Sequence, residues 1–125
     1  MVYIVDDDDS VRTGLSRLMR SARLDSRDFS SAEEFLAEID ERADGCVLMD
    51  ITMPRLSGLQ LQMELKRRGA DIPVIAVSAR DDADTRNLAH QLGARFFFRK
   101  PVDGQALIDA IQWVLASHAR GPTDA

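Results

Sequence analysis

Short apolar runs alternate with segments of helical periodicity along the whole chain, and this alternation limits the possible folds more than any other feature. Each intervening segment places apolar residues on one face of a helix, as Leu15 and Met19 do in the first. Repeated strand and helix units build a parallel sheet covered by helices, so we expect one α/β domain with five strands and five helices. The expected strands lie at 2–5, 24–29, 46–50, 72–78 and 95–98.

The segment 24–29, LDSRDF, has few apolar residues and predicts a short, half-exposed strand at a sheet edge. The helix after it can begin with a capping box, either Ser30 with Glu33 or Ser31 with Glu34. We leave these two alternatives open.

The segment 59–65, LQLQMEL, alternates apolar and polar residues with a period of two, which alone favours a strand. We expect a helix instead, because Leu, Gln, Met and Glu are all good helix formers. Such a helix has two apolar stripes, Leu59 with Met63 and Leu61 with Leu65, of which we expect one to be buried. Three methionines are assigned to the core: Met19, Met49 and Met63.

Composition and charge exclude several classes of function. The chain has 125 residues, and 16 Lys and Arg against 21 Asp and Glu give a net charge of −5, the wrong sign for gripping nucleic acid phosphates. No apolar run approaches the roughly 20 residues needed to cross a bilayer, and Met1 leads into a strand pattern, not a signal peptide. The single cysteine, Cys46, lies in an apolar run, so we expect it to be buried and the protein to be cytoplasmic.

The residues that follow the predicted strands carry the chemistry. The first strand is followed by Asp6 and Asp7, the third ends in Asp50, the fourth ends in Ser78, and Lys100 comes after the fifth. Binding sites of open parallel sheets lie beyond the carboxyl ends of the strands, so these groups are expected to meet.

Three carboxylates at one edge repel one another unless a cation neutralises them. Magnesium suits such a site, because it prefers oxygen ligands and combines one or two carboxylates with water and phosphate oxygens. A carboxylate beside this ion can attack phosphorus and form an acyl phosphate. The lysine and the serine hydroxyl would then contact the phosphoryl oxygens.

Four separated motifs, DD after the first strand, D-x-x-M-P-x-x-S-G around the third, S-A after the fourth and K-P after the fifth, resemble the receiver domain of two-component response regulators. The resemblance covers about residues 2–118. It implies a flavodoxin-like, doubly wound sheet of order 2-1-3-4-5 in a receiver domain of residues 1–118. Residues 119–125 are expected to begin a linker or a disordered tail.

The resemblance also implies site roles. Asp50 would accept a phosphoryl group from a sensor histidine kinase, and Asp6 and Asp7 would hold Mg²⁺, with Mn²⁺ as a substitute. The backbone carbonyl of Thr52 would be a further ligand. Ser78 and Lys100 match the family's hydroxyl and lysine positions, and the bond between Lys100 and Pro101 is expected to be cis.

The wording MPRLSGLQL and GARFFFRKP is most similar to receivers of nitrogen-fixation-type transcriptional regulators, which carry a C-terminal helix-turn-helix domain. Two departures from the family pattern affect how phosphorylation would change the protein's surface. At the aromatic position that responds to phosphorylation in this family, the chain has Phe97. This residue has no hydroxyl, so its response would depend on packing alone. The variable positions are Thr52 and Arg80; an arginine there can screen or contact the phosphoryl group, so the lifetime of the phosphorylated state stays open.

Other polar and aromatic residues are expected to have ordinary structural roles. In the run IVDDDDS, Asp9 or Ser10 is expected to cap the first helix and Asp8 to face water. His90 and His118 are expected to be solvated. Trp113 is expected to be partly exposed and packed against a neighbouring helix rather than a partner protein.

The leading hypothesis is a phosphorylation-controlled switch that is not an enzyme acting on separate substrates. Phosphorylation of Asp50 would move Ser78 and Phe97 and change the surface of the helix at 81–92, the last strand and the closing helix, which would dimerise or release an effector. The alternatives are a stand-alone regulator or phosphate shuttle, a small-molecule phosphatase, and a degenerate receiver that only binds proteins.

Overall fold

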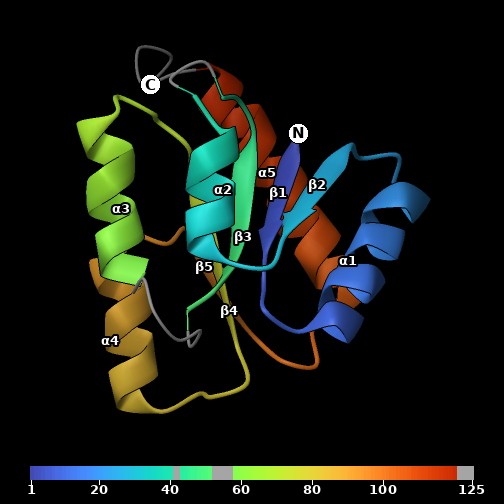
Figure 1. Ribbon diagram of the computed structural model, residues 1–125. Coiled ribbons are helices and arrows are strands. Elements are labelled where there is room, and N and C mark those ends of the chain that lie inside the picture. The colour runs from blue at the N-terminus through green and yellow to red at the C-terminus, as the bar shows by residue number, and fades with distance from the viewer. Residues whose placement is uncertain (41–42, 52–57, 121–125) are drawn as a thin grey trace.

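The computed structural model describes residues 1–40, 43–51 and 58–120. Within these residues five strands and five helices alternate (Figure 1). The strands form one parallel sheet of order β2-β1-β3-β4-β5, which confirms the predicted doubly wound α/β fold. The elements are β1 (Val2–Val5), α1 (Asp9–Ser21), β2 (Ser26–Phe29), α2 (Ala32–Glu38), β3 (Cys46–Asp50), α3 (Gly58–Arg67), β4 (Val74–Ser78), α4 (Ala83–Gln91), β5 (Phe96–Arg99) and α5 (Gly104–Arg120).

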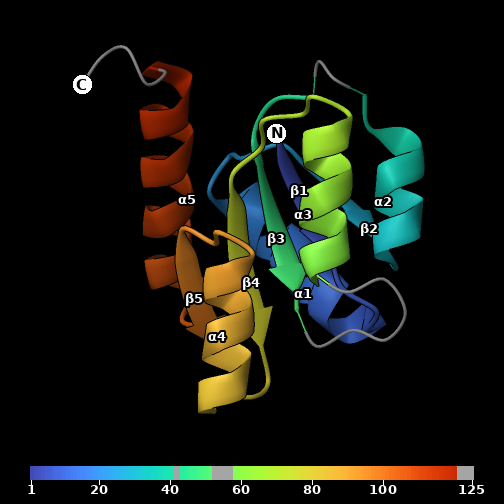
Figure 2. The same ribbon diagram turned by 90° about the vertical axis from the view of Figure 1, so that its left-hand side faces the viewer.

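The helices divide between the two faces of the sheet (Figures 1 and 2). One face is covered by α2, α3 and α4, whose Phe35, Leu65 and Ala89 belong to one buried cluster. The other face is covered by α1 and α5, whose Met19 and Ile111 belong to a second. The central strands β3 and β4 are buried along their whole length, as a sheet covered on both faces requires.

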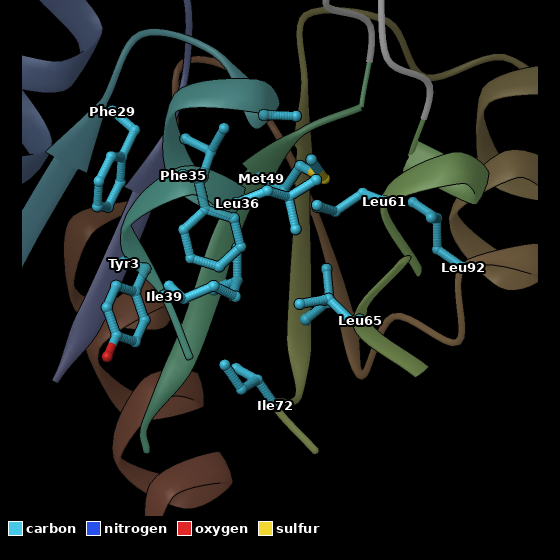
Figure 3. Packing of buried hydrophobic residues seen from close by; sticks show 14 of the residues in the cluster. Tyr3, Phe29, Phe35, Leu36, Ile39, Met49, Leu61, Leu65, Ile72 and Leu92 are labelled. Atoms are coloured by element: carbon cyan, nitrogen blue, oxygen red, sulfur yellow. The ribbon is translucent and has the colours of Figure 1, made fainter. Parts of the chain in front are cut away.

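Aromatic rings fill the α2 side of the core. The ring centroids of Tyr3 and Phe29 each lie 5.5 Å from that of Phe35, and Figure 3 shows the aliphatic side chains that continue this layer toward α3. A side chain of this size contributes about 2 kcal/mol to stability when fully buried. This layer therefore anchors α2 and α3 to the sheet.

The edge strand predicted at 24–29 is present as β2, which pairs only with β1 among the described strands. Ser31, not Ser30, caps α2, because its side chain accepts a hydrogen bond from the Glu34 amide at 3.0 Å. The strand predicted at 72–78 begins later, at Val74, because Pro73 has no amide hydrogen to donate.

The cap of α1 differs from the prediction. Asp8 is the N-cap, and its side chain accepts hydrogen bonds from the amides of Ser10 and Val11. Asp9 is the first helical residue, with a side chain that is 90% exposed. The assignment of the cap to Asp9 or Ser10 was wrong by one residue or more, because four adjacent aspartates are equally good caps and the backbone path decides among them.

The segment 59–65 is helical, as predicted. Leu61 and Leu65 are buried, whereas Met63 is 63% exposed. One of the two stripes thus faces the sheet, and the assignment of Met63 to the core was wrong, because it lies on the opposite face of α3 from Leu61 and Leu65. The side chain of Leu59 lies outside the described residues.

Four remaining predictions concern single residues. Trp113 is 57% exposed, which confirms its expected partial exposure, and it packs edge-on against Phe96 of β5 at a centroid distance of 5.9 Å. Cys46 is buried, and burial raises the pKa of its thiol to about 12. His90 is exposed, as predicted, and the side chain of His118 lies outside the described residues.

No helix among the described residues is long and apolar enough to span a membrane. The last helix, α5, continues to Arg120, two residues past the predicted end of the domain. The residues beyond it, 121–125, lie outside the described part of the chain.

Candidate functional site

The sheet order brings the predicted site residues to one edge. Strands β1 and β3 are neighbours, with Val5 paired to Met49, so Asp6 and Asp50 follow side by side. Ser78 ends β4, the next strand, and Lys100 follows β5. All of these strand ends lie at the lower edge of the sheet in Figure 1.

Lys100 joins the two buried carboxylates. Its Nζ lies 2.8 Å from an oxygen of Asp6 and 3.0 Å from an oxygen of Asp50. The carboxylates are almost inaccessible, with side chains 2% and 7% exposed, while that of Lys100 is 18% exposed. The peptide bond between Lys100 and Pro101 is cis.

The electrostatics of this group favour an additional cation. Burial raises the pKa of Asp6, and the charge of Asp50 raises it further, against the hydrogen bonds from Lys100 and from the Asp8 amide. Burial alone would lower the pKa of Lys100, but its hydrogen bonds to Asp6 and Asp50 outweigh burial and raise it. The ammonium group therefore stays charged, and one positive charge faces more than one carboxylate.

Asp7 adds a third carboxylate, which is exposed to solvent. Oxygens of Asp6, Asp7 and Asp50 all lie within 4.8 Å of one another. A set of carboxylate oxygens with excess negative charge fits a hard divalent cation such as Mg²⁺, which can keep several water ligands on the exposed side. Thr52, whose carbonyl the resemblance adds to this set, lies outside the described residues.

Ser78 occupies the opposite side of Asp50 from β1. Its side chain is fully buried, and its Oγ accepts a hydrogen bond from the Arg80 amide at 3.0 Å. Its carbonyl accepts from the Lys100 amide at 2.8 Å, which ties the ends of β4 and β5 together. A hydroxyl that accepts one bond retains its own hydrogen for donation to a ligand.

Phe97 is partly buried against the core beneath α4. The guanidinium carbon of Arg86 lies 5.2 Å from the centroid of its ring, and the same guanidinium bonds Asp81. The side chain of Arg80 pairs with Asp82 at 2.8 Å and is 67% exposed. In this arrangement Arg80 is engaged by a residue of its own loop.

Two arginines of the site were missed by the sequence reasoning. Arg12 donates a hydrogen bond to the backbone carbonyl of Asp6, and Arg86 stacks on Phe97. The sequence does hold a signal for Arg12, which precedes the buried Met19 by seven residues, close to two helical turns, and so shares its buried face. Arg86 carries no comparable signal.

Comparisons with known proteins agree with this geometry. The family model described as the response regulator receiver domain matches residues 2–112. The transcriptional regulatory protein TdiR of Thauera aromatica is 44% identical over 115 residues, which are 92% of this chain and 51% of that protein. The transcriptional regulatory protein FixJ of Azorhizobium caulinodans is 38% identical over 118 residues, 94% of this chain and 56% of that protein.

Among solved structures, the crystal structure of FixJ-N matches with a TM-score of 0.83 and 31% identity, covering 94% of this chain and 93% of that one. The chain spans about half the length of the curated relatives that it matches.

Proposed function

The chain belongs to the response regulator receiver domain family, and on that premise we propose that Asp50 accepts a phosphoryl group from a sensor histidine kinase in a Mg²⁺-dependent reaction. The observation that carries this proposal is the contact of one ammonium group, Lys100 Nζ, with both Asp6 and Asp50. One ammonium group among three carboxylates leaves excess negative charge, which a cation can neutralise. The same ammonium group can pair with a phosphoryl oxygen during the transfer.

The carboxylates of Asp6, Asp7 and Asp50 would hold Mg²⁺ or Mn²⁺, together with the carbonyl of Thr52. The bound ion would neutralise negative charge on the carboxylates and on the phosphoryl oxygens. Its ligands are carboxylates that the fold already brings together, so binding requires little rearrangement.

The transfer itself is carried by Asp50. One of its carboxylate oxygens attacks phosphorus, the bond from phosphorus to the imidazole nitrogen breaks, and the electron pair leaves with the imidazole, which takes up a proton. Lys100 would pair with a phosphoryl oxygen, and the Ser78 hydroxyl would donate a hydrogen bond to another. Later hydrolysis of the acyl phosphate in the same site would reset the switch, so the domain turns over only its own phosphoryl group.

The output would pass through Ser78 and Phe97 to the surface formed by α4, β5 and α5. The buried residues of α4 are only Thr85 and Ala89, so little apolar area pins this helix to the sheet. The surface would serve a homodimer or an effector, in a longer protein a C-terminal helix-turn-helix domain, by analogy with the transcriptional regulatory relatives. A chain that ends with the receiver, whose expected extent is residues 1–118, would act as a stand-alone regulator or phosphate shuttle in the cytoplasm.

The test is incubation with acetyl phosphate and Mg²⁺, followed by intact-protein mass spectrometry. We expect one added phosphate in the wild type and none in Asp50→Asn, while Asp8→Asn, which keeps a capping side chain, is phosphorylated normally. Unchanged labelling of Asp50→Asn would refute the assignment. Multiple turnover of a generic phosphate ester would favour a phosphatase instead, and failure to bind Mg²⁺ or beryllofluoride would favour a degenerate receiver.

A further inference from the structure

Arg12, in the first turn of α1, is an almost buried cation beside the carboxylates. Its side chain is only 13% exposed. One nitrogen donates to the backbone carbonyl of Asp6 at 2.6 Å, Nε lies 3.4 Å from a carboxylate oxygen of Asp28 in β2, and the remaining nitrogen bonds Asp9. Burial of a guanidinium is costly unless acceptors surround it, and here each of its three nitrogens has one.

The bond to the Asp6 carbonyl acts on the peptide unit that joins Asp6 to Asp7. The atoms from one Cα to the next, including this carbonyl, lie in a plane. A donor that fixes the direction of the carbonyl therefore fixes where the Asp7 backbone, and with it the exposed Asp7 carboxylate, leaves β1. The Asp6 amide is held from the other side by the Phe29 carbonyl at 3.1 Å.

We propose that Arg12 is a positioning residue for the cation site: it holds the Asp6–Asp7 peptide against α1 and β2 and so places the Asp7 carboxylate for Mg²⁺. This inference rests on the proposed function, because it presumes that Asp7 binds the ion. Arginine suits the task, since its planar fork reaches acceptors in several directions, whereas lysine is a single point charge.

Electrostatics and positioning predict opposite results for the loss of Arg12. A positive charge near a cation site repels the cation, so charge alone predicts that its removal tightens Mg²⁺ binding. Loss of a positioning contact weakens binding, because the partners that orient metal ligands are worth roughly 10- to 100-fold in affinity. The direction of the change therefore distinguishes the two roles.

The experiment measures Mg²⁺ affinity of the unphosphorylated protein by isothermal titration calorimetry. We expect Arg12→Gln to weaken binding about tenfold, and Arg12→Lys, which keeps the charge without the fork, to weaken it by a smaller factor. Arg17→Gln removes an exposed charge from the same helix and is the matched control, expected to leave affinity unchanged. The Mg²⁺ concentration for half-maximal phosphorylation by acetyl phosphate should rise in parallel in Arg12→Gln, with the rate at saturating Mg²⁺ retained.

Unchanged or tighter Mg²⁺ binding by folded Arg12→Gln would overturn the inference, and if that variant does not fold, Arg12→Lys is judged by the same criterion. Asp7→Asn separates this inference from the proposed function. If Asp7→Asn loses binding while the Arg12 variants keep it, only the role of Arg12 fails. If the wild type and Asp7→Asn bind Mg²⁺ equally, Asp7 is not a ligand and the inference about Arg12 fails, whereas the proposed function is judged separately by the phosphorylation of Asp50.

Discussion

The two sides of the site are held by different kinds of contact. On the cation side, Asp6, Lys100 and Arg12 are mostly buried, and each bonds more than one partner. On the switch side, around Ser78 and Phe97, the ion pairs are made by Arg80 and Arg86, whose side chains are 67% and 60% exposed. One sheet edge thus combines a buried charge network with a set of exposed contacts.

This difference has an energetic meaning. A buried network tolerates little displacement, because any charge left unpaired there is strongly unfavourable. Exposed ion pairs contribute little to stability and are screened by salt, so they can rearrange at small cost. The cation side is therefore suited to keep its carboxylates in a fixed arrangement. The exposed ion pairs of the switch side can rearrange when a ligand reaches Ser78.

The largest expected effect belongs to the cation side. Asp6→Asn removes a buried carboxylate from the cluster with Asp7 and Asp50. We expect Mg²⁺ affinity, measured by titration calorimetry, to fall by more than the roughly 10- to 100-fold that loss of an orienting partner costs, with phosphorylation by acetyl phosphate falling in parallel. Asp8→Asn, the matched control, should keep both, since asparagine also caps a helix.

Asp6→Asn should lose Mg²⁺ binding and yet gain thermal stability. Burial raises the pKa of Asp6 above its ordinary value of 3.8, so its ionised form is disfavoured by folding. Stability therefore falls as pH rises from about 3.8 through the folded pKa, and the penalty persists at neutral pH. Metal-free Asp6→Asn should melt at a higher temperature than the wild type at pH 7, as followed by circular dichroism. A lower melting temperature would contradict this reading of the charge network.

Local features of the fold and the site could be predicted from the sequence, and features set by packing could not. The strands and the groups at their ends were recoverable, because apolar runs and their terminal residues are local signals, and the sheet order then brings Asp6, Asp50, Ser78 and Lys100 together. The exact cap was not recoverable, because neighbouring aspartates have the same capping propensity. The exposure of Met63 was not recoverable either, since the turn of α3 toward the sheet is decided by packing.

The arginine contacts were missed for a different reason. Arg12 meets Asp28 across sixteen residues of sequence, and Arg86 meets Phe97 across eleven. Both lie on helices that cover the sheet and face solvent, where a solvated arginine is the ordinary expectation. The spacing of Arg12 from Met19 indicates its buried face, but only the three-dimensional arrangement shows that it reaches the Asp6 carbonyl and that Arg86 lies over a ring.

A smaller effect is expected from the stacked arginine of the switch side. Arg86→Gln removes both the contact with Phe97 and the ion pair with Asp81. If this contact holds the ring in its observed position, its loss should favour the rearranged state and tighten beryllofluoride binding by about two- to fivefold, the worth of one exposed cation–π contact. Mg²⁺ affinity should not change. Arg95→Gln, which changes an exposed arginine just before β5, is the control. Equal beryllofluoride affinity in all three proteins would assign Arg86 no part in the switch.

The smallest effect is expected at the cap of α4, where the partly exposed Asp82 accepts hydrogen bonds from the amide and hydroxyl of Thr85. These bonds, with those from Arg80, lower the pKa of Asp82 from 3.8 to about 2. The stabilisation is therefore present above pH 3.8 and is lost as pH falls toward about 2. Asp82→Asn keeps the cap but not the charge, so it should melt slightly below the wild type at neutral pH and converge with it in acid. A difference that stays constant down to about pH 2 would mean that the charge contributes nothing. Convergence would show that the charge of Asp82, rather than its capping geometry, makes the difference at neutral pH.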